Sequence, residues 1–259
     1  MSNQAPWLSV VIPSFNEQRN LERGVLDLVY NYLCKQSYQW ELILSDDGST
    51  DGTLIELRSF ADKDERIRLV ANPHRGKGPT VKAGMLTARG KWRLFTDFDQ
   101  STPLPELENL LKYTDDYDII IGSRELKGSL RDKEPFYRHL MGKGFNLLVQ
   151  MLAVPGIWDT QCGFKLFSAK ATTHLFPLLS IYGSEEIRTD AFTGAFDVEL
   201  LYLARKYGFK IKEVPILWRH YETTRVNPVK DSWRMFKDIV RIRLASFLGK
   251  YPNKNAIGS

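Results

Sequence analysis

The sequence predicts an α/β fold in which helices flank a mostly parallel, doubly wound sheet. Short apolar runs rich in β-branched residues alternate with segments of helical spacing, as parallel strands joined by helical crossovers require. The apolar runs are continuous, which is typical of strands buried on both faces. With 259 residues, of which 43% are hydrophobic and 26% charged, the chain can build one large α/β domain with its own core.

The first half of the chain contains five expected strands, each followed by turn-forming or helical sequence. These strands are residues 8–13, 40–45, 67–70, 92–96 and 118–122. Apolar residues at helical spacing predict helices over residues 21–33, 53–61, 79–88 and 104–113. This regular alternation is the main reason for predicting a parallel sheet.

The second half is less regular but follows the same plan. We expect helices over residues 136–152, 168–175 and 197–207, and strands over residues 162–167 and 210–215. Residues 180–195 are polar and contain glycine, so they are expected to form a mobile loop.

Cysteine content and the N-terminus favour a cytoplasmic protein. Two cysteines, Cys34 and Cys162, cannot build a disulfide framework, which indicates a reducing compartment. Residues 1–8 lack the features of a secretory signal, and no uncharged apolar run approaches the roughly 18–20 residues that span a bilayer. Any membrane contact is therefore expected to be peripheral, on the cytoplasmic face.

The net charge of +5 is concentrated at the C-terminal end. Residues 1–218 contain 27 basic and 28 acidic side chains, whereas residues 219–259 contain 9 basic and 3 acidic ones. A basic tail of this kind suggests an anionic partner such as a phosphate, a membrane surface or a nucleic acid.

Acidic side chains follow the second and fourth expected strands. Asp46 and Asp47 end one strand, and Asp97 and Asp99 end the other. In open α/β sheets ligands bind beyond the carboxyl ends of the strands, and alternate residues of an extended segment point the same way. Asp97 and Asp99 could therefore hold Mg²⁺ or Mn²⁺ together with ligand phosphates. Taken alone, each acidic pair could equally form a turn or cap a helix.

A glycine-containing loop at residues 76–78 precedes the expected helix 79–88. It lacks the G-x-x-x-x-G-K-[ST] spacing of a P-loop, so by itself it is weak evidence of phosphate binding. The ordered occurrence of all these groups at successive strand ends is more informative than any one of them.

That ordered set resembles the family 2 glycosyltransferases of GT-A fold over about residues 7–245. The matching blocks are Val10–Glu17, Ser45–Gly52, Arg75–Gly78, Asp97–Asp99, Gly122–Arg124, Asp159–Phe167, Phe196–Glu199 and Glu213–Pro215. The blocks at 159–167 and 196–199 are similar to the branch that glycosylates polyprenyl phosphates, which includes the dolichyl-phosphate glucosyltransferases and mannose synthases.

The resemblance implies a role for each matching position. Three residues would line the nucleotide pocket: Pro13, Phe15 and Glu17. Asp46 or Asp47 would hold the base or ribose, and Lys77 with Gly78 would approach the donor. Asp97 and Asp99 would bind the metal and the diphosphate. Arg124, Arg138 and Arg225 would contact the acceptor phosphate or the diphosphate. Asp159, Gln161 and Asp197 would border the donor sugar or the acceptor, and the catalytic set would be Asp99, Asp197, Arg124 and Arg138.

The resemblance also implies inverting transfer of a hexose from a sugar nucleotide to a polyprenyl phosphate. UDP-glucose is the favoured donor and GDP-mannose the second choice. The mannose synthase pattern places Gln two residues after the second aspartate, whereas Ser101 stands there in this chain, which leaves a third metal ligand in doubt. A family 2 enzyme with a hydroxyl acceptor, such as a glycolipid or saccharide, is the other alternative. The acidic strand ends argue against a nucleic-acid-binding protein, and the oligomeric state is left open.

The C-terminal region predicts a basic amphipathic helix over residues 232–249. Its apolar stripe is formed by Trp233, Phe236, Val240, Leu244 and Phe247. Such a helix is typical of elements that lie at a membrane surface, although the same stripe could pack against the rest of the protein. We therefore expect a transferase domain over residues 1–220 and a basic segment with this helix over residues 221–259.

Overall fold

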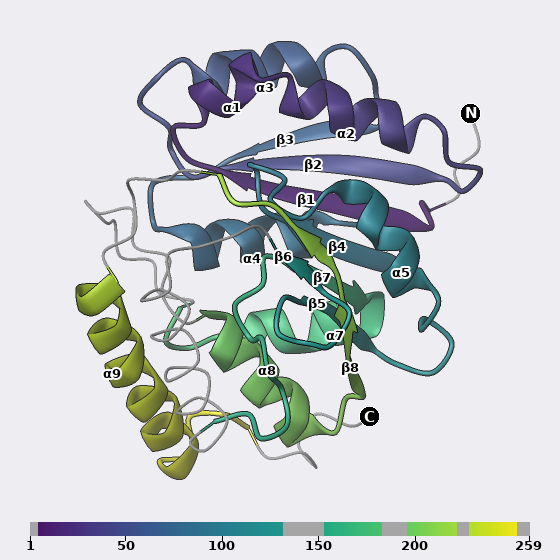
Figure 1. Cartoon of the computed structure of the whole chain (residues 1–259). Coiled ribbons are helices and arrows are strands. Elements are labelled where there is room, and N and C mark those ends of the chain that lie inside the picture. The colour runs from purple at the N-terminus through teal and green to yellow at the C-terminus, as the bar shows by residue number, and fades with distance from the viewer. Residues whose placement is uncertain (1–4, 132–152, 183–195, 222–227, 253–259) are drawn as a thin grey trace.

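A seven-stranded sheet forms the centre of the computed structural model, which describes residues 5–131, 153–182, 196–221 and 228–252 (Figure 1). The strands of this sheet are β1 (Leu8–Ser14), β2 (Trp40–Asp46), β3 (Ile67–Ala71), β4 (Trp92–Thr96), β5 (Ile119–Ser123), β7 (Phe164–Ser168) and β8 (Ile211–Pro215). A second, two-stranded sheet pairs β6 (Leu130–Arg131) with β9 (Leu217–Trp218).

The strand order is β3-β2-β1-β4-β7-β5-β8. Every neighbouring pair is parallel except those that involve β7, which runs antiparallel to both β4 and β5. This arrangement confirms the predicted α/β fold with a mostly parallel sheet. The insertion of β7 beside β4 places the residues before β7 next to the carboxyl end of β4, because the two strands run in opposite directions.

Helices cover both faces of the sheet. They are α1 (Gln18–Glu22), α2 (Val25–Leu33), α3 (Thr53–Ala61), α4 (Lys77–Thr87), α5 (Leu107–Leu111), α7 (Ala169–Leu175), α8 (Phe196–Tyr207) and α9 (Pro228–Phe247), with 3₁₀ turns at Leu104–Glu106 and Phe176–Leu178. In Figure 1, α1, α2 and α3 lie on one side of the strands, and α4, α7 and α8 lie on the other.

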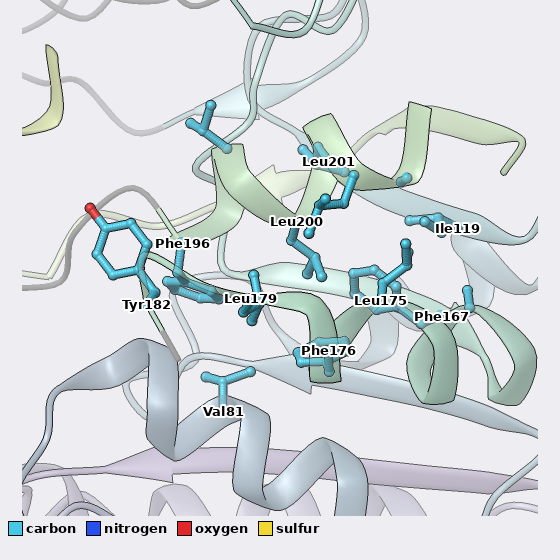
Figure 2. Close-up of a cluster of buried hydrophobic side chains, with 14 of the residues drawn as sticks. Val81, Ile119, Phe167, Leu175, Phe176, Leu179, Tyr182, Phe196, Leu200 and Leu201 are labelled. Carbon is cyan, nitrogen blue, oxygen red and sulfur yellow. The ribbon is translucent and has the colours of Figure 1, made fainter. Parts of the chain in front are cut away.

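Two hydrophobic clusters form the core, one on each face of the sheet. Along β1, Val10 and Ile12 enter the cluster with α2, α3 and α5, while Val11 enters the cluster with α4, α7 and α8. Figure 2 shows the second cluster, in which Val81 of α4 and Leu200 of α8 approach from opposite sides. Burial on both faces explains why the strands are continuously apolar.

Several helix boundaries differ from the prediction. The expected helix 21–33 divides into α1 and α2 at Gly24, whose φ of 71° is left-handed and breaks the regular hydrogen bonding. The expected helix 104–113 is a 3₁₀ turn at Leu104–Glu106 followed by α5, which ends at Leu111. The expected helix 136–152 lies outside the described residues, as does residue range 183–195 of the expected loop.

Helix α9 lies at the outer edge of the molecule beside α8 (Figure 1). Ile239, Ile242 and Ala245 are buried in the core cluster shared with α8. The predicted stripe lies on the opposite side, where the exposed fractions are 59% for Trp233 and 88% for Phe247. The helix therefore has two apolar stripes. The stripe of Ile239, Ile242 and Ala245, which was not predicted, packs the helix against the domain.

Candidate active site

The carboxyl ends of β1, β2 and β4 meet at one edge of the sheet, because these three strands are adjacent and parallel. Asp46 ends β2, Asp97 follows β4 directly, and Lys77 opens α4 after the glycine loop. The topology thus brings together groups that are 20 to 51 residues apart in the sequence. This edge is where a ligand of an open α/β sheet is expected.

A cluster of charged groups lies beyond β4. The Nζ of Lys77 donates to Oδ1 of Asp97 at 2.5 Å, and Oδ1 of Asp99 accepts from the backbone N of Ser101 at 2.8 Å. Gly163, just before β7, faces the Asp97 carboxylate so closely that an added Cβ would lie 1.9 Å from Oδ2. Because Gly163 has no side chain, the Asp97 carboxylate can occupy this space.

The pKa values of this cluster report an excess of negative charge. Burial and the neighbouring charge of Asp97 raise the pKa of Asp99. Burial would lower the pKa of Lys77, but the charges of Asp97, Asp197 and Asp99 outweigh it and raise that pKa. Two carboxylates that repel each other beside one lysine form an electrostatic environment that favours a further cation.

The Asp97 and Asp99 carboxylates fit a divalent cation by their chemistry. Both supply hard oxygen donors, and the side chain of Asp97 is 35% exposed, so a ligand can reach it. Within the described part of the chain, no three His, Cys, Asp or Glu side chains form a complete metal site. Mg²⁺ is commonly bound by one or two carboxylates together with substrate phosphates, which matches a pair rather than a full cage.

Asp46 and Asp47 organise two loops. Asp46 is fully buried and accepts hydrogen bonds from Ser14 and Ser49, with the Ser49 hydroxyl 2.6 Å from Oδ1. Asp47 accepts from the backbone N of Arg75 and of Gly76. The Asp47 carboxylate thereby fixes the loop that leads to Lys77, a structural function that the sequence analysis had not assigned to it.

An aromatic pair flanks this loop. The ring of Phe15 stacks on that of His74 with centroids 4.1 Å apart and an interplanar angle of 2°, and His74 Nδ1 lies 2.9 Å from Oδ2 of Asp47. Phe15, predicted to line the nucleotide pocket, thus lies beside this loop. His74 was not predicted, because a lone histidine in a loop has no distinctive spacing. Pro13 is buried in β1 at the same edge.

Two other predicted residues support the surrounding backbone. Glu17 accepts from the Asn20 side chain at 2.5 Å, and its backbone N donates to Thr53 Oγ1. Gly78 lies against Phe196 and Tyr182, so an added Cβ would come within 3.1 Å of Phe196 Cβ. Close packing between α4 and the start of α8 therefore depends on this glycine.

A second ionic group lies beyond β5. Arg124 donates from Nε and Nη2 to the two oxygens of Asp159, at 2.7 and 2.8 Å. Burial would raise the pKa of Asp159, but the charge and hydrogen bonds of Arg124 outweigh it and lower that pKa. Glu213 accepts from the backbone N of Trp158 and of Asp159 and so fixes this segment. The fork-shaped contact indicates that Asp159 orients Arg124.

Asp197 lies in the first turn of α8 and is paired with Lys165, which was not predicted as a site residue. Its Oδ1 lies 2.6 Å from Nζ of Lys165, a fully buried residue of β7. Burial raises the pKa of Asp197, although the charges of Lys165 and Lys77 oppose that change. Asp197 thus belongs to the same electrostatic cluster as Lys77 and Asp97. Gln161 precedes β7, the strand that contains Lys165, and is half-buried. Arg138 and Arg225 lie outside the described residues.

Comparison with known proteins identifies the family of the chain. Residues 9–176 match the model of the family described as glycosyl transferase family 2. The chain is 37% identical over 264 residues to dolichyl-phosphate beta-glucosyltransferase of Dictyostelium discoideum, covering 96% of this chain and 77% of that protein. It is 35% identical over 262 residues to the human protein of the same name, covering 94% and 77%.

Solved structures with the same fold are more distant in sequence. Glucosyl-3-phosphoglycerate synthase from Mycobacterium tuberculosis, in complex with UDP, has a TM-score of 0.63 at 20% identity, covering 94% of this chain and 80% of that chain. A mannosyltransferase from Pyrobaculum calidifontis, in complex with GDP-Man and Mn²⁺, has a TM-score of 0.59 at 20% identity, covering 96% and 67%. The sheet, the helices on both its faces and these likenesses confirm the predicted GT-A fold, and the chain belongs to glycosyl transferase family 2.

Proposed function

We propose that this enzyme transfers glucose, with inversion, from UDP-glucose to a dolichyl-type polyprenyl phosphate. The observation that carries the proposal is the cluster of Lys77, Asp97 and Asp99 at the carboxyl edge of the sheet, in a chain whose relatives share the name dolichyl-phosphate beta-glucosyltransferase. The relatives' name supplies the sugar and the acceptor, and the cluster supplies groups suited to a diphosphate.

The reaction follows from charge. A phosphate acceptor is already an anion at neutral pH, so its oxygen can attack the anomeric carbon with little help from a general base. The leaving nucleoside diphosphate gains charge, which a cation at the site stabilises. Mg²⁺ or Mn²⁺, held by Asp97 and Asp99, would supply Lewis-acid stabilisation there. Lys77, which already contacts Asp97, would place its ammonium group near the diphosphate.

Arg124 supplies a second anchor in this proposal. Asp159 holds its guanidinium in one orientation, and an oriented guanidinium is suited to a phosphate. Arg138 and Arg225 remain proposed contacts of the acceptor phosphate, and Gln161 and Asp197 remain proposed neighbours of the donor sugar or acceptor.

The lipid acceptor gives a reason for contact with an anionic membrane. None of the helices in the described ranges is long and apolar enough to cross a bilayer. The exposed face of α9 contains the apolar residues Trp233, Leu244 and Phe247. The basic side chains of Lys237 and Arg241 are exposed beside them. This composition suits a helix lying at a lipid surface. In this proposal residues 1–220 carry out the transfer and residues 221–259 contact the membrane on its cytoplasmic face.

The test is a transfer assay with radiolabelled UDP-glucose and dolichyl phosphate in vesicles, with and without Mg²⁺ or Mn²⁺. We expect a chloroform-soluble glucosyl lipid that is stable to base and labile to mild acid, and we expect a chelator to abolish it. Parallel assays contain GDP-mannose as donor or a water-soluble saccharide as acceptor. Product only with GDP-mannose would establish mannosyl transfer, and product only with the saccharide would establish a hydroxyl acceptor.

A further inference from the structure

Lys165 is a fully buried lysine beside the candidate active site. Its ammonium group donates to Oδ1 of Asp197 at 2.6 Å and also to the backbone carbonyl of Cys162. Like Phe167 two residues later, Lys165 projects from β7 toward the face of the sheet that α8 covers. The strand thus delivers a positive charge to the first turn of α8, where Asp197 lies.

Stability alone gives a poor account of this ion pair. Removing two charges from water is costly, and well-packed apolar side chains of similar volume often replace a buried pair without loss. The surroundings of Lys165 would suit such a replacement, because Phe95 is its partner in β4 and Phe167 and Phe196 are buried on the same face of the sheet. A charge in this apolar strand therefore indicates a function for the pair.

The pair is continuous with the charged groups of the active site. The ammonium groups of Lys165 and Lys77 lie 5.1 Å and 6.0 Å from the centroid of the Phe95 ring. Asp197 also interacts electrostatically with Lys77 and Asp97. If all are ionised, the carboxylates of Asp97, Asp99 and Asp197 with the two ammonium groups carry one net negative charge. Lys165 thus balances the charge of Asp197 within this cluster.

We propose that Lys165 is a positioning residue that holds the carboxylate of Asp197 in place for sugar transfer. This inference rests on the proposed function, because it takes Asp197 to border the reacting sugar or the acceptor. Oδ1 is fixed by Lys165, and among the described residues no hydrogen bond to Oδ2 of Asp197 is found. In this proposal Oδ2 faces a substrate hydroxyl, and Lys165 acts on the reaction only through Asp197.

Three variants test this inference: Lys165→Met, Asp197→Asn and the double variant. For Lys165→Met we expect kcat to fall about a hundredfold, since a small misplacement of a catalytic group has an effect of this size. The KM for UDP-glucose and the affinity for UDP, measured by calorimetry, should change little. In the Asp197→Asn background, Lys165→Met should cause no further loss of kcat, because its target is already absent. Independent multiplicative losses would overturn the proposal.

A stability cycle on the same variants gives a readout that does not need activity. Each single variant leaves one buried charge without its partner and should lower the unfolding midpoint, while the double variant should recover most of it. Loss without recovery would show that the two residues do not act as a pair. If the wild type transfers no hexose with any donor, the proposed function fails, and the stability cycle still measures the pairing.

A matched control separates lost stability from lost catalysis. Glu41 is a buried carboxylate at the opposite edge of the sheet, and Arg89 donates to its Oε1 and Oε2 from the backbone N and from Nε. Glu41→Gln replaces this buried carboxylate and should lower the unfolding midpoint while leaving kcat of the folded enzyme unchanged. If Glu41→Gln lowers kcat as much as Lys165→Met does, the effect of Lys165 is general destabilisation and the proposal is wrong.

Discussion

Asp99 is a residue whose negative charge opposes folding at the proposed metal and diphosphate site. It lies in a buried segment, and the charge of Asp97 two residues earlier disfavours its ionised form. Burial and the charge of Asp97 outweigh the hydrogen bond from Ser101 and the charge of Lys77, so the ionised form of Asp99 opposes folding, as is common at binding sites. We therefore expect Asp99 to have opposite effects on stability and on activity.

Replacing Asp99 by Asn should separate these two effects. Burial and the charge of Asp97 raise the pKa of Asp99 in the folded protein. Asp99 therefore lowers the free energy of unfolding as the pH rises from about 3.9, the ordinary pKa of Asp, through the raised pKa of the folded state. Asp99→Asn removes this loss, so its free energy of unfolding should exceed that of the wild type at pH 7 but not at pH 3. Denaturant unfolding at both pH values measures this difference. The kcat should fall at least about a hundredfold, since Lewis-acid stabilisation contributes several kcal/mol.

Asp97→Asn is the matched comparison for that prediction. It leaves Lys77 without its carboxylate partner, so it should lower stability at pH 7 while also reducing kcat. If Asp99→Asn retained full activity, the assignment of Asp99 to the metal and diphosphate site would be wrong.

Gly163 provides a second test at the scale of single residues. A Cβ at this position would overlap the Asp97 carboxylate, whose oxygen would be 1.9 Å away. Gly163→Ala should therefore displace that carboxylate and lower kcat about tenfold or more, with the fold retained as measured by circular dichroism. Gly52→Ala serves as the control, because its Cβ would meet only the flexible end of Gln18. Equal activity of the two variants would contradict the importance of the Asp97 position.

Individual site residues were predictable to different degrees. Asp97, Asp99 and Lys77 were recognisable because they belong to ordered motifs at strand ends. Lys165 was not, since a lysine within the strand-forming run 162–167 gives no sign of which face it enters or which carboxylate it meets. Glu213 lay in a matching block but had no assigned role, because its contact with residues 158 and 159 depends on the tertiary fold.

At the scale of single elements, α9 carries two apolar faces with different functions. Ile239, Ile242 and Ala245 follow a three-residue spacing and are buried against the domain, while Leu244 and Phe247 are 53% and 88% exposed. A buried bond from Tyr182 to Asp238 reinforces the packed face. Sequence periodicity alone could not decide which stripe faces the protein, because both stripes have helical spacing.

The two faces should respond oppositely to substitution. Ile242→Ala should lower the free energy of unfolding by about 2–5 kcal/mol and leave vesicle binding of the folded protein unchanged. The double variant Leu244→Ser/Phe247→Ser should keep its stability within about 0.5 kcal/mol. It should bind vesicles containing phosphatidylserine at least about tenfold less tightly, because two apolar side chains no longer enter the lipid.

Exposed apolar residues elsewhere supply the control for vesicle binding. Leu28 on α2 and Ile55 on α3 are 66% and 76% exposed. Their double replacement by Ser should not alter sedimentation with the vesicles. Equal binding by the α9 variant and the wild type would reject the proposed membrane contact of this helix.

For the whole molecule, the alternation of strands and helices was sufficient to predict the sheet, because continuous apolar runs form strands buried on both faces. The antiparallel direction of β7 was not predictable, since its residues are equally apolar in either direction. That direction brings Gly163 to Asp97 and Lys165 to Asp197, in the proposed active site. The site thus depends on topology that no local pattern encodes.

Binding of the donor to the folded chain should raise the stability of the whole molecule. A ligand that binds only the folded state stabilises it by RT ln(1 + [L]/Kd), about 2.7 kcal/mol at a concentration of 100 Kd. For a domain of this size that corresponds to a rise in Tm of roughly 5–10 °C. UDP-glucose with Mn²⁺ should produce this rise, measured by differential scanning fluorimetry, and GDP-mannose with Mn²⁺ should produce a smaller one.

The metal-dependent part of that stabilisation should depend on Asp99. In the wild type, removing Mn²⁺ with a chelator should reduce the Tm rise caused by UDP-glucose, because Asp97, Asp99 and the diphosphate would share the cation. In Asp99→Asn the rise should be small with or without Mn²⁺, whereas Gly52→Ala should behave as the wild type. A larger rise with GDP-mannose than with UDP-glucose would assign the donor to mannose. No rise with either nucleotide would reject the donor proposal, since a site that binds the folded state must stabilise it.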